Sequence, residues 1–156
     1  MKKTHLFFVA AFSISLLVAC NSDSNQESTT TEETTDNTTS MSTDPKGIGP
    51  HENIELTHPL DESMVATGKQ VYELKCSSCH KLDNDRVVGP GWAGVTDRRT
   101  PEWIMNFITN VDEMLDRDTA SQRMLEECLV RMPNQSLSEA DARGVLEFMR
   151  KNDDKN

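Results

Sequence analysis

The sequence is poor in several features, and each shortage narrows the classes of protein to be considered. Only one long apolar run occurs, at residues 6–19, and it is shorter than the ~20 residues of an ordinary transmembrane helix. Strand patterns with alternating apolar residues are absent, which argues against a β-sheet fold. Basic residues are outnumbered, with 16 Lys and Arg against 26 Asp and Glu. The resulting net charge of −10 argues against binding to nucleic acid or to an anionic membrane surface.

Cysteine is also scarce, with four residues in the chain, yet two of them form a specific pattern. Cys76 and Cys79 are separated by two serines, and His80 follows directly. Cys-x-x-Cys-His is the attachment motif of a c-type haem. The two thiols can add to two vinyl groups of one porphyrin, and the histidine then becomes the proximal ligand of the iron. The sequence therefore predicts one covalent haem c.

Two other kinds of site also use a cysteine pair. A dithiol redox site is expected near a β-α-β pattern, which this sequence does not show. A zinc site needs about four ligands, and no second cysteine pair exists to supply them. The remaining cysteine of the domain, Cys128, lies on an apolar helical stripe, where a small buried side chain is expected. A reactive or intermolecular thiol is the alternative for Cys128.

The N-terminus has the pattern of an export signal. Lys2 and Lys3 precede the apolar run, which ends in Leu-Val-Ala followed by Cys20. A plain signal peptide needs no cysteine there, and the pattern resembles a bacterial lipobox, in which the cysteine receives lipid after cleavage. We therefore expect residues 1–19 to be a lipoprotein signal peptide and Cys20 to carry the lipid; an incidental cysteine in a secreted protein is the alternative. The expected location is the bacterial cell envelope, with the folded domain on the periplasmic side.

Three segments are predicted after the signal peptide. Residues 20–45 comprise Cys20 and a stretch rich in Ser, Thr and acidic residues, with no Lys or Arg and one apolar residue, Met41. Such a segment cannot bury enough surface to offset its chain entropy, so we expect a disordered tether. Residues 46–61 are expected to be an N-terminal extension. Residues 62–156 have the length of one domain.

The domain is predicted to be all-α. Helix starts are indicated by capping side chains that precede apolar stretches, namely Asp61 or Ser63, Thr100 before Pro101, Thr119 paired with Gln122 as a capping box, and Ser138. The helix that follows Thr100 carries apolar residues with helical spacing on one face, namely Trp103, Ile104, Phe107 and Ile108. The first helix runs into the cysteine motif.

From about residue 62 to 151 the chain resembles the class I cytochromes c. Gly68 and Tyr72 lie one turn apart before the haem motif, and a Gly-Pro pair ending at Pro90 follows it, as in that family. The resemblance implies short helices wrapped around one haem, with the last helix crossing the first at a glycine that permits close approach. It also implies that the Pro90 carbonyl accepts a hydrogen bond from His80 Nδ1, which would orient the ring. The residues that match the crossing face are Val145, Phe148 and Met149.

The sixth ligand of the iron decides what such a haem can do, because a thioether raises the potential and closes the iron to substrates. Met132 stands directly before Pro133 in a polar loop ahead of the last helix. This arrangement resembles the Met-Pro ligand loop of the class I cytochromes c. The predicted axial pair is therefore His80 and Met132, with Met114, in another expected loop, as the alternative sixth ligand.

Two further pairs of residues are ambiguous in the sequence. A second histidine ligand would lower the potential, but His51 and His58 precede the first helix beside prolines, where a solvent-facing or lightly packed position is more common. Arg98 and Arg99 can pair with the two haem propionates, because a guanidinium binds a carboxylate bidentately, and the family often has a basic residue here. A solvated pair beside a helix start is the alternative.

Together these features predict a mono-haem electron carrier, not an enzyme, held at a membrane by its lipid anchor. The alternative is a haem enzyme or gas sensor with an open distal site, which the single haem motif and the Met132 loop disfavour. Residues 87–103 also resemble lipoprotein cytochromes c of Bacteroidota, some of which accompany respiratory nitrous oxide reductase, and this implies donation to a terminal reductase. The expected partners are redox proteins, with donor and acceptor unidentified. We expect a monomer that does not bind nucleic acid.

Overall fold

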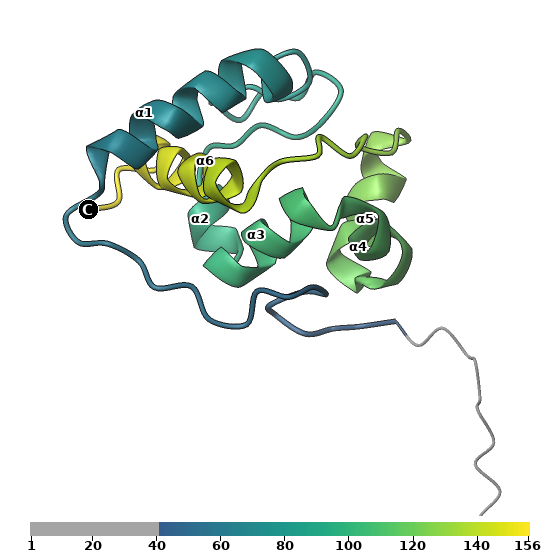
Figure 1. The fold of residues 1–156 in the computed structure, drawn as a ribbon. Coiled ribbons are helices and arrows are strands. Elements are labelled where there is room, and N and C mark those ends of the chain that lie inside the picture. Colours follow the sequence, from purple (N-terminus) through teal and green to yellow (C-terminus); the bar gives the residue numbers. More distant parts are fainter. Residues whose placement is uncertain (1–40) are drawn as a thin grey trace, which may run out of the picture. The chain divides into compact units, whose positions relative to one another are not determined.

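The computed structural model describes residues 41–156, and the regular structure of this part of the chain is helical (Figure 1). In chain order the elements are α1 (Glu62–Val71), the π-helical turn η1 (Tyr72–Cys76), α2 (Val95–Arg98), α3 (Pro101–Thr109), α4 (Val111–Arg117), α5 (Thr119–Cys128) and α6 (Glu139–Asn152). Within residues 41–156 there is no strand, and the all-α prediction is confirmed. None of the helices described is both long and apolar enough to cross a membrane.

Four of the helices begin at side chains that cap their first turn. The predicted caps of α1, α3 and α6 are confirmed, since Asp61, Thr100 and Ser138 each accept a backbone N–H from the first turn. For α5 the prediction of Thr119 is wrong by one residue. The cap is Asp118, whose carboxylate accepts the backbone N–H of Ser121 at 2.8 Å. Aspartate and threonine are both good caps, so two adjacent candidates left the start of this helix ambiguous in the sequence.

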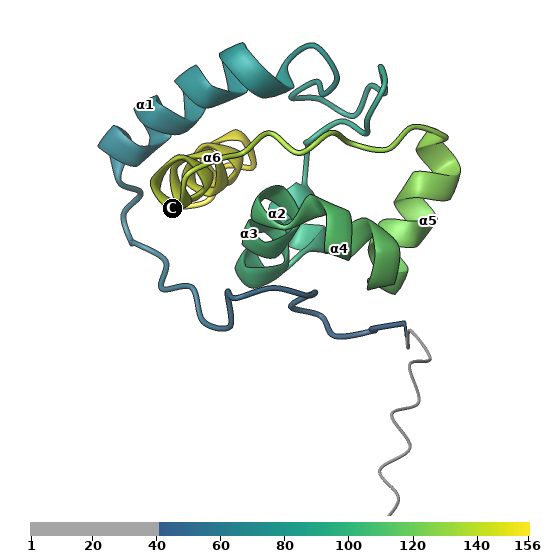
Figure 2. The same ribbon diagram turned by 45° about the vertical axis from the view of Figure 1, so that its right-hand side comes forward.

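Helix α1 lies across α6, as both views of the ribbon show (Figures 1 and 2). The contact is centred on Gly68, where an added Cβ would lie 2.8 Å from the Cβ of Phe148. Of the residues predicted to form this crossing face, Val145, Phe148 and Met149 are all buried. Tyr72, one turn after Gly68, has its ring centroid 5.5 Å from that of Phe148.

Residues 41–61, here called the strap, run beneath α3 before they reach the start of α1 (Figure 1). The strap includes residues 41–45, which the sequence assigned to the tether. Ser42 nevertheless bonds to the junction of α4 and α5: its N–H donates to the Arg117 carbonyl at 2.7 Å, and its carbonyl accepts from Thr119 N–H at 2.9 Å. The Thr100 hydroxyl donates to the Pro45 carbonyl at 3.0 Å. Residues 42–45 are therefore bound to the helical domain.

A buried asparagine clamps the middle of the strap. The Nδ2 of Asn106, a residue of α3 that is 1% exposed, donates to the carbonyls of Lys46 and His51 at 2.9 and 3.0 Å. Its Oδ1 accepts the backbone N–H of His51 at 3.0 Å. The Asn106 side chain thus provides the hydrogen bonds that these backbone groups of the strap would otherwise make within a helix or a sheet. His51 is half-buried and His58 is exposed, as expected, but the sequence did not predict the hydrogen bonds that hold the backbone here.

A buried carboxylate holds the end of the strap to α6. Glu147 is fully buried and accepts hydrogen bonds from the Thr57 hydroxyl at 2.8 Å and from Asp61 N–H at 3.3 Å. Arg143 and Arg150 form ion pairs with the same carboxylate at 2.7 and 2.8 Å. Charged groups are rarely buried unless they are paired. This cluster fixes α6, and with it the start of α1, to the strap.

Candidate haem site

Both motif cysteines lie on one helical turn. The π-helical turn η1 is closed by Ser77 N–H, which donates to the Tyr72 carbonyl at 2.9 Å. The amides of Cys79 and His80 then both donate to the Cys76 carbonyl, at 3.0 and 2.9 Å, so the turn continues through the motif. Neither Cys76 nor Cys79 forms a disulfide within residues 41–156. Burial raises the pKa of Cys76 to about 11.

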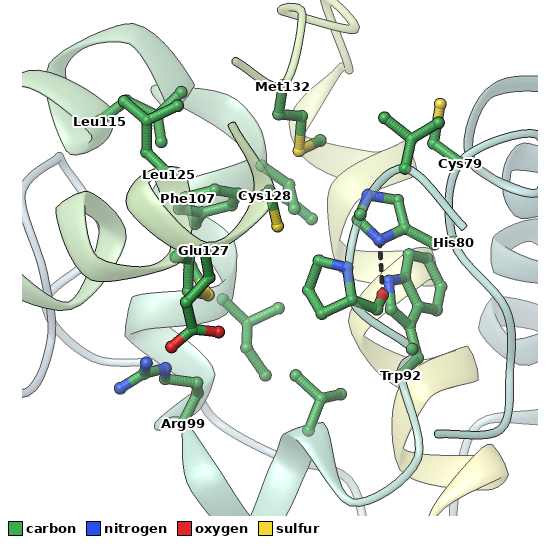
Figure 3. Close-up of a pocket in the computed structure, with 18 of the residues that line it drawn as sticks. Cys79, His80, Trp92, Arg99, Phe107, Leu115, Leu125, Glu127, Cys128 and Met132 are labelled. Atoms are coloured by element: carbon green, nitrogen blue, oxygen red, sulfur yellow. Dashed lines mark hydrogen bonds between the residues drawn. The ribbon is translucent and has the colours of Figure 1, made fainter. Parts of the chain in front are cut away.

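His80 is held in a defined orientation. Its Nδ1 is 2.8 Å from the Pro90 carbonyl oxygen, the hydrogen bond that the resemblance implied (Figure 3). A carbonyl can only accept, so Nδ1 is the protonated nitrogen and Nε2 keeps the lone pair that a metal requires. Burial lowers the pKa of His80, which the Pro90 bond partly offsets, so the neutral ring is favoured. The Tyr72 hydroxyl also donates to the His80 carbonyl at 2.9 Å.

Gly89 allows the loop after the motif to lie flat against the His80 ring. A Cβ added at Gly89 would overlap the imidazole, 2.7 Å from Nδ1. The Gly89 amide donates to the Cys79 carbonyl at 3.0 Å, which fastens the loop to the motif. The Gly-Pro pair therefore has two physical duties, one for each residue: the glycine makes room for the ring, and the proline supplies the acceptor.

His80 and Met132 line one cavity of about 670 Å³. Figure 3 shows both side chains directed into the same space, His80 from the motif and Met132 from the loop between α5 and α6. The volume is in the range of sites that hold cofactors, ~300–1,000 Å³. The apolar walls are formed mainly by Val88, Trp92, Val95, Trp103, Ile104, Phe107, Ile108, Leu115, Met124, Leu125, Val130 and Met149. An apolar cavity with an imidazole and a thioether at its walls fits a haem. The apolar walls suit the large flat ring, and the imidazole and the thioether are ligands that haem iron accepts.

The loop that carries Met132 is fastened on two sides. Arg131 forms an ion pair with Asp116 of α4 at 2.9 Å, and Lys75 of the motif turn donates to the Gln135 carbonyl at 3.0 Å. Leu129 ends α5 with a positive φ of 59°, which turns the chain toward this loop. The loop around Met132 is therefore positioned by contacts both to α4 and to η1.

The alternative iron ligands lie elsewhere. Met114 belongs to helix α4 and not to a loop, so that expectation is wrong. It is fully buried, does not line the cavity, and its sulfur is 3.0 Å from the Ile48 amide of the strap. His51 and His58 also lie outside the cavity. The Nε2 of His51 is instead 3.3 Å from the Thr109 hydroxyl oxygen. The zinc alternative gains no support either, since residues 41–156 bring together no group of three metal-binding His, Cys, Asp or Glu side chains.

The cavity also holds residues whose part in the site was ambiguous or missed. Arg98 and Arg99 both line it, and the Arg99 guanidinium lies 4.5 Å from the centre of the Trp103 ring. Cys128 lines the same space. Trp92 was missed: it is buried with its ring centroid 5.8 Å from that of His80. An aromatic residue shortly after the motif was the one signal for it.

A carboxylate at the end of α6 holds the short helix α2, a contact that the sequence analysis did not predict. Asp153 accepts hydrogen bonds from the amides of Gly94 and Thr96 at 2.7 and 2.9 Å, and from the Thr96 hydroxyl at 2.8 Å. Because α2 carries Val95 and Arg98 to the cavity wall, Asp153 positions that wall. The predicted signal peptide, Cys20 and the tether as far as residue 40 lie outside the described residues.

Comparisons with known proteins agree with this geometry. The model of the family described as cytochrome c matches residues 65–153. A cytochrome c from Rhodothermus marinus is 33% identical, and the match covers 70% of this chain and 97% of that one with a TM-score of 0.66. An engineered form of the Rhodothermus marinus protein gives 32% identity, the same coverage and a TM-score of 0.66; bound to a carbene intermediate it gives 0.63. No curated protein matches. The chain therefore belongs to the cytochrome c family, as a class I mono-haem member that carries one covalent haem c.

Proposed function

We propose that the protein is a membrane-tethered electron carrier of the cell envelope whose haem iron is held between His80 and Met132. Membership of the cytochrome c family makes it a haem electron carrier, and the finer assignment is supported by one observation above the others. His80 and Met132 line the same apolar cavity, while Met114 does not. The bound haem supplies one-electron chemistry, because its iron can alternate between the ferrous and ferric states.

The residues of the motif have separate duties in this proposal. Cys76 and Cys79 form the two thioethers, and their place on a single turn brings both thiols to one ring. His80 donates Nε2 to the iron, and the bond from Nδ1 to the Pro90 carbonyl fixes the ring and makes it a better donor. Met132 would supply a second protein ligand to the iron, which would leave small molecules no open coordination site.

Arg98 and Arg99 are proposed to receive the haem propionates. Both line the cavity, and neither has a carboxylate of this chain within ion-pairing distance. The Arg98 Nη1 donates to the Ala93 carbonyl at 2.6 Å, and the stacking of Arg99 on Trp103 holds its guanidinium plane. A positioned guanidinium suits bidentate binding of a carboxylate.

The place of the carrier in the cell follows from the N-terminus. Cytochrome c domains are typically extracytoplasmic, which agrees with the predicted signal peptide, and Cys20 is proposed as the lipid-bearing residue. Electrons would then pass between redox proteins at the same membrane. The resemblance of residues 87–103 to Bacteroidota lipoprotein cytochromes supports a terminal reductase, such as nitrous oxide reductase, as the acceptor.

The alternative, a haem enzyme or gas sensor with an open distal site, makes different spectroscopic predictions. Visible and near-infrared spectra of the purified holoprotein in both redox states test the two. A closed His–Met site should give the weak sulfur-to-iron band of the ferric protein at the red edge of the visible range, and slow carbon monoxide binding when reduced. If the band is absent and carbon monoxide binds fast, the protein is a haem enzyme or gas sensor with an open distal site and not a closed electron carrier.

A further inference from the structure

The chain from His80 to Trp92, here called the proximal loop, leaves the haem motif and returns to it. Its base is closed by a backbone hydrogen bond from Trp92 N–H to the Lys81 carbonyl at 2.8 Å. The loop contains Pro90, whose carbonyl accepts the hydrogen bond from His80 Nδ1 at 2.8 Å. The position of this acceptor relative to the imidazole therefore depends on what holds the two ends of the loop.

The start of the proximal loop is bonded to Asn152, the last residue of α6. The Nδ2 of Asn152 donates to the carbonyl of Leu82, two positions after His80, at 2.9 Å. This hydrogen bond joins residues 70 positions apart in the sequence. The Leu82 carbonyl belongs to a loop and has no helical partner, so the Asn152 side chain supplies the donor that it needs. The chain directly after the iron ligand is thereby attached to α6.

The end of the proximal loop is bonded to the next residue of the chain, Asp153. Its Oδ1 accepts the amide of Gly94, two positions after Trp92, at 2.7 Å. Its Oδ2 accepts the amide of Thr96 at 2.9 Å and the hydroxyl of the same residue at 2.8 Å. Both carboxylate oxygens are therefore engaged, and the two ends of the loop are attached to adjacent residues at one end of α6.

The backbone at this end of α6 is itself well fixed. The amide of Lys155 donates to the Arg150 carbonyl at 2.9 Å, and the amide of Asp154 donates to the Lys151 carbonyl at 3.2 Å. Asp154 has a positive φ of 53°. These two hydrogen bonds around a left-handed residue form a Schellman cap, which satisfies the last carbonyls of the helix. A capped helix end thus presents both side chains that hold the proximal loop.

We propose that Asn152 and Asp153 are positioning residues of the haem site. By holding both ends of the proximal loop, they keep the Pro90 carbonyl within reach of the His80 Nδ1–H. This role depends on the proposed function only through His80 as a ligand of the iron, and it is independent of the sixth ligand. A histidine that donates its other N–H to an acceptor is a stronger donor to a metal. A stronger donor stabilises the ferric form, so loosening the loop should raise the midpoint potential.

Asn152→Leu tests this role without changing the charge of the protein, because an apolar group of similar size replaces the amide. The ferrous holoprotein is kept under carbon monoxide, so that the iron is low-spin whichever group holds its sixth position. NMR then follows the exchange of the His80 Nδ1 proton with deuterium. This proton should exchange about tenfold faster than in the wild type, which corresponds to the loss of one hydrogen bond. The midpoint potential, measured without carbon monoxide, should rise.

A second neutral variant tests the other end of the loop, and a third is the matched control. Thr96→Val removes the hydroxyl bond to Asp153 and should change both quantities in the same direction, but less, because the Thr96 amide still donates. Thr57→Val also removes one hydrogen bond of α6, from the Thr57 hydroxyl to Glu147 at 2.8 Å, but at the strap. It should lower the free energy of unfolding as Asn152→Leu does, and leave the exchange rate and the potential unchanged.

Two results would overturn the positioning role. Exchange of the His80 Nδ1 proton at the wild-type rate in both Asn152→Leu and Thr96→Val would show that the contacts to α6 do not hold the Pro90 acceptor. Equally fast exchange in Thr57→Val and Asn152→Leu would assign the effect to a general loss of stability. A sixth ligand other than Met132 would alter neither comparison, so failure of this role is distinguishable from failure of the proposed function.

Discussion

Gly68 of α1 lies against Gly144 of α6 so closely that a Cβ on Gly68 would overlap the Gly144 carbonyl oxygen. A Cβ on Gly144 would be 3.1 Å from both the Gly68 nitrogen and the Met64 carbonyl oxygen. The two backbones therefore touch at the point where the first and last helices cross. Gly68 was predicted at this crossing, but Gly144 was not. The crossing fixes α1, and thereby the motif turn that follows it.

Gly68→Ala should destabilise the protein by about 1–3 kcal/mol, because the methyl group meets backbone atoms that cannot rotate away. Urea denaturation of the holoprotein, followed by helical circular dichroism, measures the loss. Gln70→Ala, at an exposed position of the same helix, is the control and should change stability by less than about 0.5 kcal/mol. Equal stability of Gly68→Ala and wild type would show that the helices do not approach as closely as described.

Local chemistry made much of the site predictable. The spacing of Cys76, Cys79 and His80 predicts the haem motif because each residue has its own duty within five positions. Met132 was predicted as the sixth ligand because it stands in a polar loop, where no packing role competes. Trp103 and its helix followed from a cap and an apolar stripe. In each case the signal lies within a few residues of the chain.

What the sequence could not show are polar contacts between distant segments. In the sequence, Asn106 and Glu147 look like ordinary polar residues of helices. In the structure both are buried, because their side chains form hydrogen bonds with the backbone of the strap. Apolar periodicity does not report such contacts, so the sequence did not predict them. The burial of Met114 has the same origin, since its neighbours at the strap lie far away in sequence.

Glu147 should make stability depend on pH. Burial alone would raise the pKa of Glu147, but hydrogen bonds from Arg143, Thr57, Arg150 and the Asp61 amide bring it below its ordinary value of 4.5. A carboxyl with a lowered folded-state pKa stabilises the fold above its unfolded pKa. This stabilisation should decline as the pH falls below about 4.5 and be lost once the pH is below the folded-state pKa.

Glu147→Gln should therefore cost about 3 kcal/mol at pH 7, the usual loss when one partner of a buried pair is removed. It should also flatten the decline in stability at acid pH, measured by urea denaturation across the pH series. Glu126→Gln, at an exposed site of α5, should leave both quantities unchanged. An acid decline in Glu147→Gln as steep as that of wild type would assign the effect to other carboxyls.

The three thiols of the domain should differ in their chemistry. Cys76 and Cys79 should each form one thioether, so acid extraction under denaturing conditions should leave the haem on the polypeptide. Cys128→Ser should keep one covalent haem per chain, because Cys128 lies outside the motif although it lines the cavity. Intact mass spectrometry measures all variants. Haem release from wild type, or loss of attachment in Cys128→Ser, would contradict this division.

Cys20 should anchor the protein to a membrane. Each buried CH₂ of a lipid chain contributes about 0.8 kcal/mol, so Cys20→Ser should release the protein into the soluble fraction or leave it unprocessed. Fractionation of cells after a salt wash, with blotting for the cytochrome, measures the distribution. Cys128→Ser serves as the control and should remain with the membranes. If Cys20→Ser still sediments with membranes, lipid on Cys20 is not the anchor.

The proposed function depends on Met132 as the sixth ligand of the iron, and the ferric spectrum of Met132→Ala shows whether it holds that position. Met114→Leu, which keeps the volume of a buried side chain remote from the cavity, is the control. The sulfur-to-iron band should vanish in Met132→Ala and persist in Met114→Leu, while the haem stays covalently attached in both. With the site open, Met132→Ala should also bind carbon monoxide quickly when reduced. If the band survives in Met132→Ala, another residue is the sixth ligand and the proposed site is wrong.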